Sequence, residues 1–262
     1  MPNEIFFFSG TGNSLALAKS LAGKLGNTRL TRIAYTDDAE IVSTAEKVGI
    51  IYPVYSFGMP KIVKAFIGKL KVPPNSYVFA VCNYAGMSGS SMKQTQKALA
   101  AGNIKLNAGF GLVMPSNYLP FGGAEPEEKF QKKVGRAETR LERIAGIVKA
   151  GESRNIENPW YFPYWLTELA NRYFLKSIVK EVKKLHADDK CTGCGLCTKV
   201  CPTVNVRLVE GKPQWGTNCE LCLACLQWCP VHAVQMGNIS PDRKRYHHPD
   251  IQAKELITDR EF

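Results

Sequence analysis

The sequence has no long apolar run. No stretch of the 262-residue chain approaches the roughly 18 consecutive apolar residues of a membrane-spanning helix, so no transmembrane segment is expected. The apolar residues 5–8 are too few for a signal peptide, and no basic region precedes them. These features favour a cytoplasmic protein.

Histidine is scarce, and the common catalytic arrangements are missing. The chain has four histidines, and none lies in a recognisable Ser/His/Asp or metal-ligand pattern. They are His186, His232, His247 and His248. We interpret His247 and His248 as part of a surface loop. No paired carboxylates mark a hydrolytic site, so we predict no catalytic side chain and expect the chemistry to reside on bound cofactors.

Eight of the nine cysteines form one pattern that occurs twice. Each copy has the spacing C-x-x-C-x-x-C-x-x-x-C and is followed by proline, which is the spacing of bacterial ferredoxins with two [4Fe–4S] clusters. Three thiolates of one copy wrap around one cluster, and the fourth cysteine binds the other cluster. The predicted ligand sets are Cys191, Cys194 and Cys197 with Cys229, and Cys219, Cys222 and Cys225 with Cys201.

Two other uses of cysteine fit this spacing less well. Structural zinc prefers four ligands in two spaced pairs, whereas each copy here has three cysteines in close succession. A disulfide framework is typical of small secreted chains, and we expect neither property here. The ninth cysteine, Cys82, ends an apolar run and is interpreted as a small buried hydrophobic residue.

The formal net charge of +11 is unevenly distributed along the chain. Residues 1–150 carry 19 Lys and Arg against 10 Asp and Glu, while residues 151–262 carry 15 against 13. Two interpretations stay open: a solvated basic face, or a surface that docks an acidic redox partner. Nucleic-acid binding is not expected, because the basic residues are not interleaved with aromatics as in single-strand grooves.

Apolar runs alternate with helical patterns over residues 1–150, which predicts an α/β domain with a parallel sheet. The expected strands cover residues 4–9, 29–33, 47–52, 77–83 and 108–115, and the expected helices cover 13–25, 60–70, 90–101 and 125–150. A break at 151–163, rich in Gly, Pro and polar residues, marks the end of this domain.

The rest of the chain divides into three parts. Residues 151–186 are a linker and an amphipathic helix, which either lies on a membrane or, as we favour, packs the two domains together. Residues 187–237 hold both cysteine motifs and are expected to form a small α+β ferredoxin-like domain. Residues 238–262 are a polar C-terminal tail without a clear period.

A turn rich in glycine and hydroxyl groups follows the first expected strand and leads into a helix. It consists of Ser9, Gly10, Thr11, Gly12, Asn13 and Ser14. At a helix N-terminus, such a turn binds phosphate through amide N–H groups and hydroxyls. Leu15 replaces the third glycine of the dinucleotide fingerprint, and the lysine of a P-loop is missing. The turn resembles the loop that holds the FMN phosphate in flavodoxins.

Two further loops follow the third and fourth expected strands. Flavodoxin-like sheets bind their ligand at the carboxyl ends of the strands, so both loops are expected at the flavin. They comprise Pro53, Val54, Tyr55, Ser56, Phe57 and Gly58, and Asn83, Tyr84, Ala85 and Gly86. Tyr55 and Tyr84 are the expected stacking partners of the flavin ring. Residues 114–118, after the fifth strand, are expected to border the same cleft.

Together, these motifs resemble those of the flavodoxin–ferredoxin fusion proteins of anaerobic bacteria and archaea. The resemblance includes the tail residues 245–249, which read Arg-Tyr-His-His-Pro. It implies a flavodoxin-like domain with a five-stranded parallel sheet of order 2-1-3-4-5. It also implies FMN, two [4Fe–4S] clusters and a role in electron transfer. The first domain departs from separate flavodoxins because it is basic and its flavin loops lack acidic residues.

Two functions are compatible with the sequence. The first, which we favour, is an electron-transfer protein that relays low-potential electrons between two clusters and FMN for a protein partner. The second is a flavin-dependent reductase of a small substrate, supplied with electrons by its own ferredoxin domain, with a tyrosine or solvent as proton donor. If the flavin and the clusters lie far apart in one chain, a homodimer is expected to bring them together.

Overall fold

The computed structural model describes residues 2–157 and 163–257. Its centre is a five-stranded parallel sheet of β1 (Asn3–Phe7), β2 (Thr28–Arg32), β4 (Lys47–Pro53), β6 (Tyr77–Tyr84) and β7 (Leu106–Val113). The strand order is β2-β1-β4-β6-β7. Counted along the chain, this is the order 2-1-3-4-5 of flavodoxin-like sheets, so the predicted fold class is confirmed.

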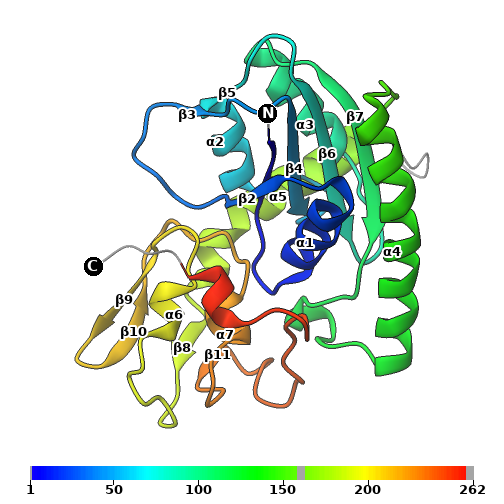
Figure 1. Cartoon of the computed structure of the whole chain (residues 1–262). Helices are drawn as coiled ribbons and strands as arrows, with labels where there is room; N and C mark the ends of the chain where they lie inside the picture. Colours follow the sequence, from blue (N-terminus) through cyan, green and yellow to red (C-terminus); the bar gives the residue numbers. More distant parts are fainter. Residues whose placement is uncertain (1, 158–162, 258–262) are drawn as a thin grey trace.

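Helices cover both faces of the sheet (Figure 1). On one face α1 (Asn13–Leu25) contacts α4 (Glu127–Ala150), and on the other α2 (Lys61–Lys69) contacts α3 (Ser91–Ala101). Side chains alternate along β1, so that Ile5 and Phe7 join the core under α1 and α4, while Phe6 and Phe8 join the core under α2 and α3. Because both faces are buried, the strand is a continuous apolar run in the sequence.

A second domain contains the cysteine motifs and lies at the carboxyl ends of the sheet strands (Figure 1). Its elements are β8 (Leu185–Ala187), α6 (Leu196–Lys199), β9 (Val206–Val209), β10 (Lys212–Trp215), α7 (Ala224–Gln227) and β11 (Val234–Met236). The strands form two antiparallel pairs, β9 with β10 and β8 with β11. This is a small α+β domain, as the sequence predicted.

Helix α5 (Tyr164–Val182) packs the two domains together, as favoured from the sequence. Ile178 and Val182 lie in one core with Leu221 of the cysteine-rich domain. On the other side, Asn171 Nδ2 donates a hydrogen bond to Tyr55 O at 2.8 Å. The helix ends earlier than predicted, because Leu185–Ala187 forms strand β8 instead. No helix within the described ranges is long and apolar enough to cross a membrane.

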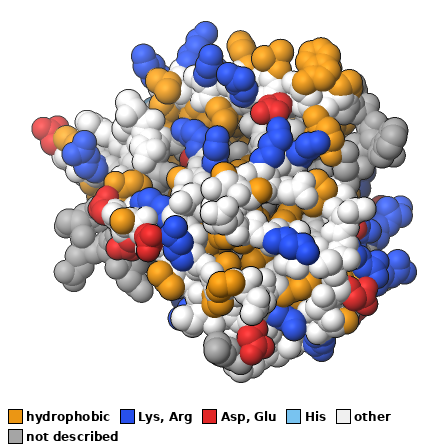
Figure 2. All heavy atoms as spheres, turned by 90° about the horizontal axis from the view of Figure 1, so that it is seen from above, with side chains coloured by type: hydrophobic (Ala, Val, Ile, Leu, Met, Phe, Trp, Pro, Cys, Tyr) orange, Lys and Arg blue, Asp and Glu red, His pale blue; other side chains and the backbone are white. Residues whose placement is uncertain are grey.

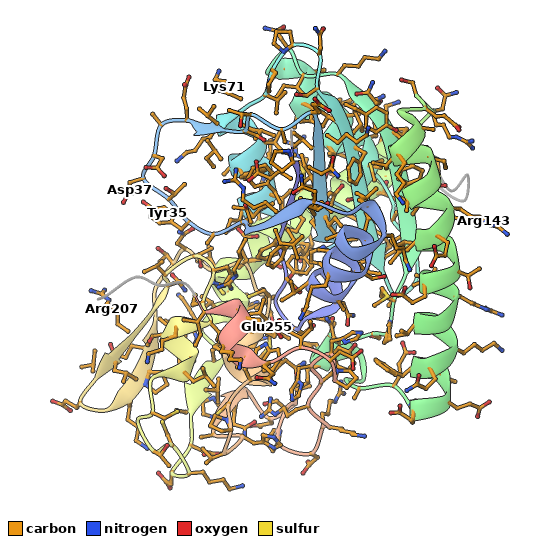
Figure 3. All side chains as sticks on the ribbon, in the orientation of Figure 1. Tyr35, Asp37, Lys71, Arg143, Arg207 and Glu255 are labelled. Atoms are coloured by element: carbon orange, nitrogen blue, oxygen red, sulfur yellow. The ribbon has the colours of Figure 1, made fainter. Side chains whose placement is uncertain are left out.

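Polar contacts also join the domains. The buried Glu220 accepts a hydrogen bond from Ile62 N at 3.0 Å and thereby caps the N-terminus of α2. Trp228 Nε1 donates to Gly10 O at 2.9 Å. Tyr35 N, in the loop after β2, donates to Pro202 O at 2.7 Å, and Figure 3 shows Tyr35 where that loop reaches the cysteine-rich domain.

Two features were not predicted. The two-residue strands β3 (Ile41–Val42) and β5 (Leu70–Lys71) pair in parallel, but they are too short to show a periodic pattern. The described part of the C-terminal tail, residues 238–257, contains the 3₁₀ helix η2 (Ala253–Leu256) and is packed against the first domain. The interpretation of His248 as a surface residue is wrong, since its exposed fraction is 2%. His247 is exposed and stacks on the Trp228 ring at 4.4 Å.

Candidate functional site

A cavity of about 620 Å³ lies at the carboxyl ends of β1, β4, β6 and β7. It is lined by most of the residues predicted to contact a flavin: Ser9, Gly10, Thr11, Asn13, Ser14, Pro53, Val54, Tyr55, Ser56, Phe57, Asn83, Tyr84, Ala85 and Gly86. Residues 114–118, predicted at its border, also line it. The parallel sheet thus brings four separate loops to one place.

Gly12 and Gly58 do not line the cavity, although both were predicted as flavin contacts. Gly12 has a φ of 101°, and a Cβ there would lie 2.9 Å from His248 Cβ. A Cβ at Gly58 would overlap the Asn171 side chain. Gly12 therefore allows close packing against the tail, and Gly58 allows close packing against α5. A local sequence pattern does not reveal either contact.

The Gly-rich turn (residues 9–14) presents hydrogen-bond donors to the cavity. Ser9 Oγ accepts a hydrogen bond from Gly12 N at 3.1 Å. Ser14 Oγ accepts one from Asn83 Nδ2 at 2.7 Å, and Thr11 Oγ1 accepts one from a side-chain amide. Each hydroxyl therefore retains its own proton for donation. The first amides of α1 have no carbonyl partner within the helix, and no side chain of the preceding residue caps this end. This donor set fits a phosphate group.

The two predicted ring contacts have different surroundings. Tyr55 packs edge-on against Phe8, with ring centroids 6.0 Å apart. Burial raises the pKa of Tyr55 well above its usual value. The Tyr84 ring lies over the backbone of β7, 3.0 Å from where a Cβ of Gly111 would be. Both tyrosines line the cavity: Tyr55 lies in the loop after β4, and Tyr84 is the last residue of β6.

Two walls of the cavity were not anticipated from the sequence. Helix α5 contributes Ala170, Tyr173, Phe174 and Ser177, and the cysteine-rich domain contributes Leu221, Cys222 and Leu223. A Cβ added to Gly10 would lie 2.6 Å from Cys222 O, so only glycine allows this approach. A predicted cluster ligand thus lines the same cavity as the predicted phosphate-binding turn.

The eight motif cysteines lie in two groups around two smaller cavities. The proximal set, which contains the wall residue Cys222, comprises Cys201, Cys219, Cys222 and Cys225. The distal set comprises Cys191, Cys194, Cys197 and Cys229. In each set the fourth cysteine comes from the other sequence motif. Both groupings coincide with the ligand sets expected from ferredoxin spacing.

The cysteine sulfurs do not form a site for a single ion. Four thiolates around one zinc, each 2.3 Å from the metal, are about 3.8 Å apart. Among residues 2–157 and 163–257, no three Cys, His, Asp or Glu side chains approach closely enough to hold one metal ion.

Several thiols in the two sets are shielded from water, which disfavours their ionised form. Burial raises the pKa of Cys219 and of Cys197 to about 11. Bare thiols in these positions are protonated at neutral pH, and a metal ion deprotonates the thiols that it binds.

Two partly buried arginines lie near the cysteine sets. Arg32 Nε and Arg245 Nη1 have no hydrogen-bond partner within the described parts of the chain. Burial lowers the pKa of Arg32 to about 10, which is still well above neutral pH, so Arg32 stays positive. Burial also lowers the pKa of Arg245. Negatively charged clusters would provide the electrostatic partners that these cations lack.

Replacing Arg32 by glutamine should lower the reduction potential of the proximal cluster by tens of millivolts. A nearby positive charge stabilises the more negative, reduced cluster, so its removal makes reduction harder. The measurement is an anaerobic redox titration followed by electron paramagnetic resonance. Arg29→Gln is the control, because Arg29 lies on the same strand, is exposed and pairs with Glu4. An unchanged potential in Arg32→Gln would contradict this role.

Cys82 takes no part in either cysteine set. Its exposed fraction is 1%, and burial raises its pKa to about 12. The sequence interpretation of Cys82 as a buried hydrophobic residue is confirmed.

Comparison with known proteins finds a family match in the cysteine-rich domain. Residues 183–230 match the protein family described as a 4Fe-4S dicluster domain. An uncharacterized polyferredoxin-like protein of Methanocaldococcus jannaschii is 27% identical over 119 residues, which are 40% of this chain and 70% of that protein. A second protein of that description from the same organism is 33% identical over 67 residues, 26% of this chain and 28% of that protein. The two-electron reduced flavodoxin of Megasphaera elsdenii aligns with 53% of this chain and 98% of its own, at 18% identity and a TM-score of 0.34.

The sheet order identifies the first domain, and the family match identifies the second. The chain is therefore a fusion of a flavodoxin-like domain with a 4Fe-4S dicluster ferredoxin domain, and thus an iron–sulfur redox protein.

Proposed function

We propose that this protein relays low-potential electrons between two [4Fe–4S] clusters and FMN on behalf of a protein partner. One observation carries the proposal: Cys222 belongs to the proximal set and also lines the large cavity. A cluster ligand is thus part of the wall of the proposed flavin site. One chain brings the two sites together, so the function requires no second copy.

The cofactor sites follow from the residues already described. We assign the FMN phosphate to Ser9, Thr11, Ser14 and the first amides of α1, and the flavin ring to the part of the cavity next to Tyr55 and Tyr84. The distal and proximal cysteine sets each hold one cluster. When bound, the clusters exchange single electrons and the flavin exchanges one or two. Thiolate ligands of this kind need a reducing compartment, which we take to be the cytoplasm.

The distal set is the contact point that we propose for a redox partner. Cys194 is exposed, whereas Cys201 of the proximal set has an exposed fraction of 8%. Part of the basic charge of the first domain lies far from the distal set. Figure 2 views the end of the molecule away from the cysteine-rich domain, and Lys and Arg side chains are spread over that face. This distribution favours a solvated basic face there over a partner site.

The lining of the cavity favours a carrier over a substrate reductase. No Asp, Glu, His, Lys or Arg is among the described residues that line it. Burial raises the pKa of both Tyr55 and Tyr84, which makes them weak proton donors at neutral pH. A reductase that adds hydrogen to a small molecule would have to draw its protons from solvent.

Anaerobic reconstitution tests the proposed function. Purified protein should contain about eight iron, about eight sulfide and one FMN per chain. Reduced methyl viologen should reduce the flavin rapidly in the complete protein and slowly after iron has been removed by a chelator. Zinc in place of iron, or a protein without FMN, would refute the proposal. Rapid turnover of NADH or a small acceptor would favour the reductase.

A further inference from the structure

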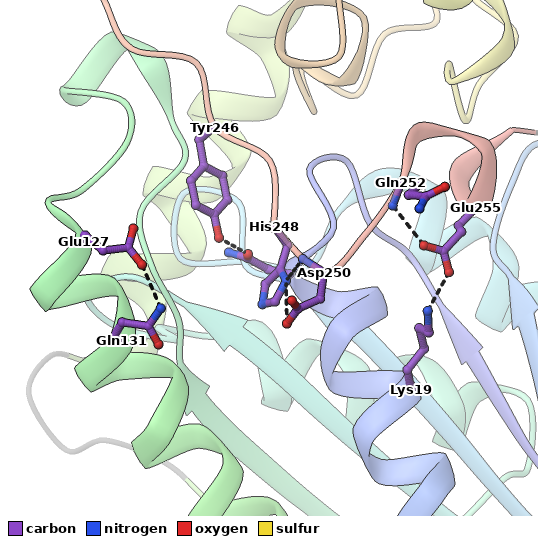
Figure 4. Close-up of polar contacts among 9 residues, drawn as sticks. Lys19, Glu127, Gln131, Tyr246, His248, Asp250, Gln252 and Glu255 are labelled. Carbon is purple, nitrogen blue, oxygen red and sulfur yellow. Dashed lines mark hydrogen bonds and ion pairs between the residues drawn. The ribbon is translucent and has the colours of Figure 1, made fainter.

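The C-terminal strap, defined here as residues 238–257, crosses the N-terminal end of α1 (Figure 4). We propose that this strap holds the Gly-rich turn in the shape that binds the FMN phosphate, with Tyr246 as the positioning residue. The inference rests on the proposed function, because it concerns the affinity of the same flavin site.

Tyr246 connects the strap to the first residue of α1. Its hydroxyl donates a hydrogen bond to Asn13 Oδ1, and Asn13 Nδ2 donates to Pro115 O at 3.1 Å. The exposed fraction of Tyr246 is 7%, and burial raises its pKa, so the hydroxyl stays protonated and acts as a donor. The Asn13 side chain is thereby fixed between the strap and the loop after β7.

The strap also contacts the backbone of the turn. His248 N donates a hydrogen bond to Thr11 O at 2.8 Å. The next residue, Gly12, lies directly against His248, which leaves no room for a Cβ. Thr11 and Gly12 therefore cannot move away from the cavity without displacing the strap.

A second connection between the strap and the cavity runs through the side-chain amides of two residues. Tyr246 N donates to Gln227 Oε1 at 2.8 Å, and Gln227 Nε2 donates to Asn117 O at 2.8 Å. Asn117 Nδ2 in turn donates to Thr11 Oγ1. The exposed fraction of Gln227 is 2%, so this connection is shielded from water.

The end of the strap is firmly anchored. Ile251 and Leu256 belong to the core under α1 and α4. Lys19 of α1 pairs with Glu255 at 2.6 Å, as Figure 4 shows, and Arg32 donates a hydrogen bond to Leu256 O. A turn held in its binding shape loses less conformational freedom when a ligand arrives and binds it more tightly.

Tyr246→Phe tests the proposal, because it keeps the ring and removes only the hydroxyl. Without that donor, Asn13 Oδ1 becomes a buried acceptor with no partner, and the first turn of α1 should shift. The Kd for FMN should rise about tenfold. The Kd for riboflavin, which has no phosphate, should stay the same. Both are measured by anaerobic calorimetry on full-length, cluster-loaded protein from which the flavin has been removed, with iron and sulfide quantified.

Tyr77→Phe is the matched control. Tyr77 is also largely buried and donates to Glu152 O at 2.7 Å, at the end of the sheet away from the cavity. It should leave both Kd values unchanged. Equal FMN affinity in Tyr246→Phe and wild type, or equal losses for FMN and riboflavin, would overturn the strap proposal alone. Wild-type protein that binds neither flavin would overturn the proposed function as well.

Discussion

Replacing Cys222 by alanine should stop electron delivery from the clusters to the flavin. The substitution removes one ligand of the proximal cluster and part of the cavity wall at the same time. Iron content should fall from about eight to about four per chain, because a cluster with three thiolates is poorly retained. Anaerobic stopped-flow absorbance with reduced methyl viologen measures flavin reduction, which should lose its fast phase.

Cys197→Ala is the matched control for this experiment. It removes a ligand of the distal set, and Cys197 does not line the large cavity. Iron content should fall by the same amount, but FMN should remain bound at the wild-type level. The proposed arrangement is wrong if Cys222→Ala retains fast flavin reduction, or if Cys197→Ala loses its flavin while keeping both clusters.

Gly10→Ala should disrupt both cofactor sites through a single methyl group. The new Cβ would lie 2.6 Å from Cys222 O and 3.1 Å from Cys222 Cβ, and neither atom is at the end of a flexible side chain. The Gly10 carbonyl also accepts the hydrogen bond from Trp228, so the turn cannot retreat without losing that contact. Overpacking of this kind costs about 1–3 kcal/mol. Thermal unfolding should occur at a lower temperature, and the protein should contain less FMN and less iron.

Gly23→Ala shows whether such a loss is specific. Gly23 lies inside α1, and an added Cβ there meets no atom within 4 Å. Alanine is the better helix former by about 1 kcal/mol, so this variant should unfold at the same or a higher temperature than wild type. If Gly10→Ala behaves like Gly23→Ala, the turn is not pressed against the cysteine-rich domain.

Local patterns in the sequence predicted most of the first domain. Helix α1 begins at Asn13 as expected, because the left-handed Gly12 separates it from β1. Apolar runs predicted four of the five sheet strands, since strands that are largely buried contain few polar residues, whereas the edge strand β2 is mostly polar and partly exposed. The spacing of the cysteines likewise predicted which of them lie together, because three ligands in one short loop leave the fourth position to the other motif.

The remaining features depend on residues that are far apart in the sequence. Tyr246 and His248 are buried by contacts with the Gly-rich turn and α4. Their burial was not predicted, because isolated buried residues in a polar tail give no periodic hydrophobic pattern. The end of α5 was misplaced because Leu185 continues the apolar pattern of the helix while it pairs in a strand. The wall that Cys222 contributes to the cavity could not be predicted, since no pattern specifies how two domains dock.

The contact between Gly10 and Cys222 has a consequence for biosynthesis. Assembly of the proximal cluster and occupancy of the turn by phosphate both depend on the position of the same pair of residues. If the bound cluster holds this pair in the shape that binds the phosphate, thermodynamic reciprocity requires that the phosphate favours the cluster to the same degree. A cell that is starved of iron should consequently accumulate this protein with a smaller share of its vitamin-derived cofactor, even when riboflavin is plentiful.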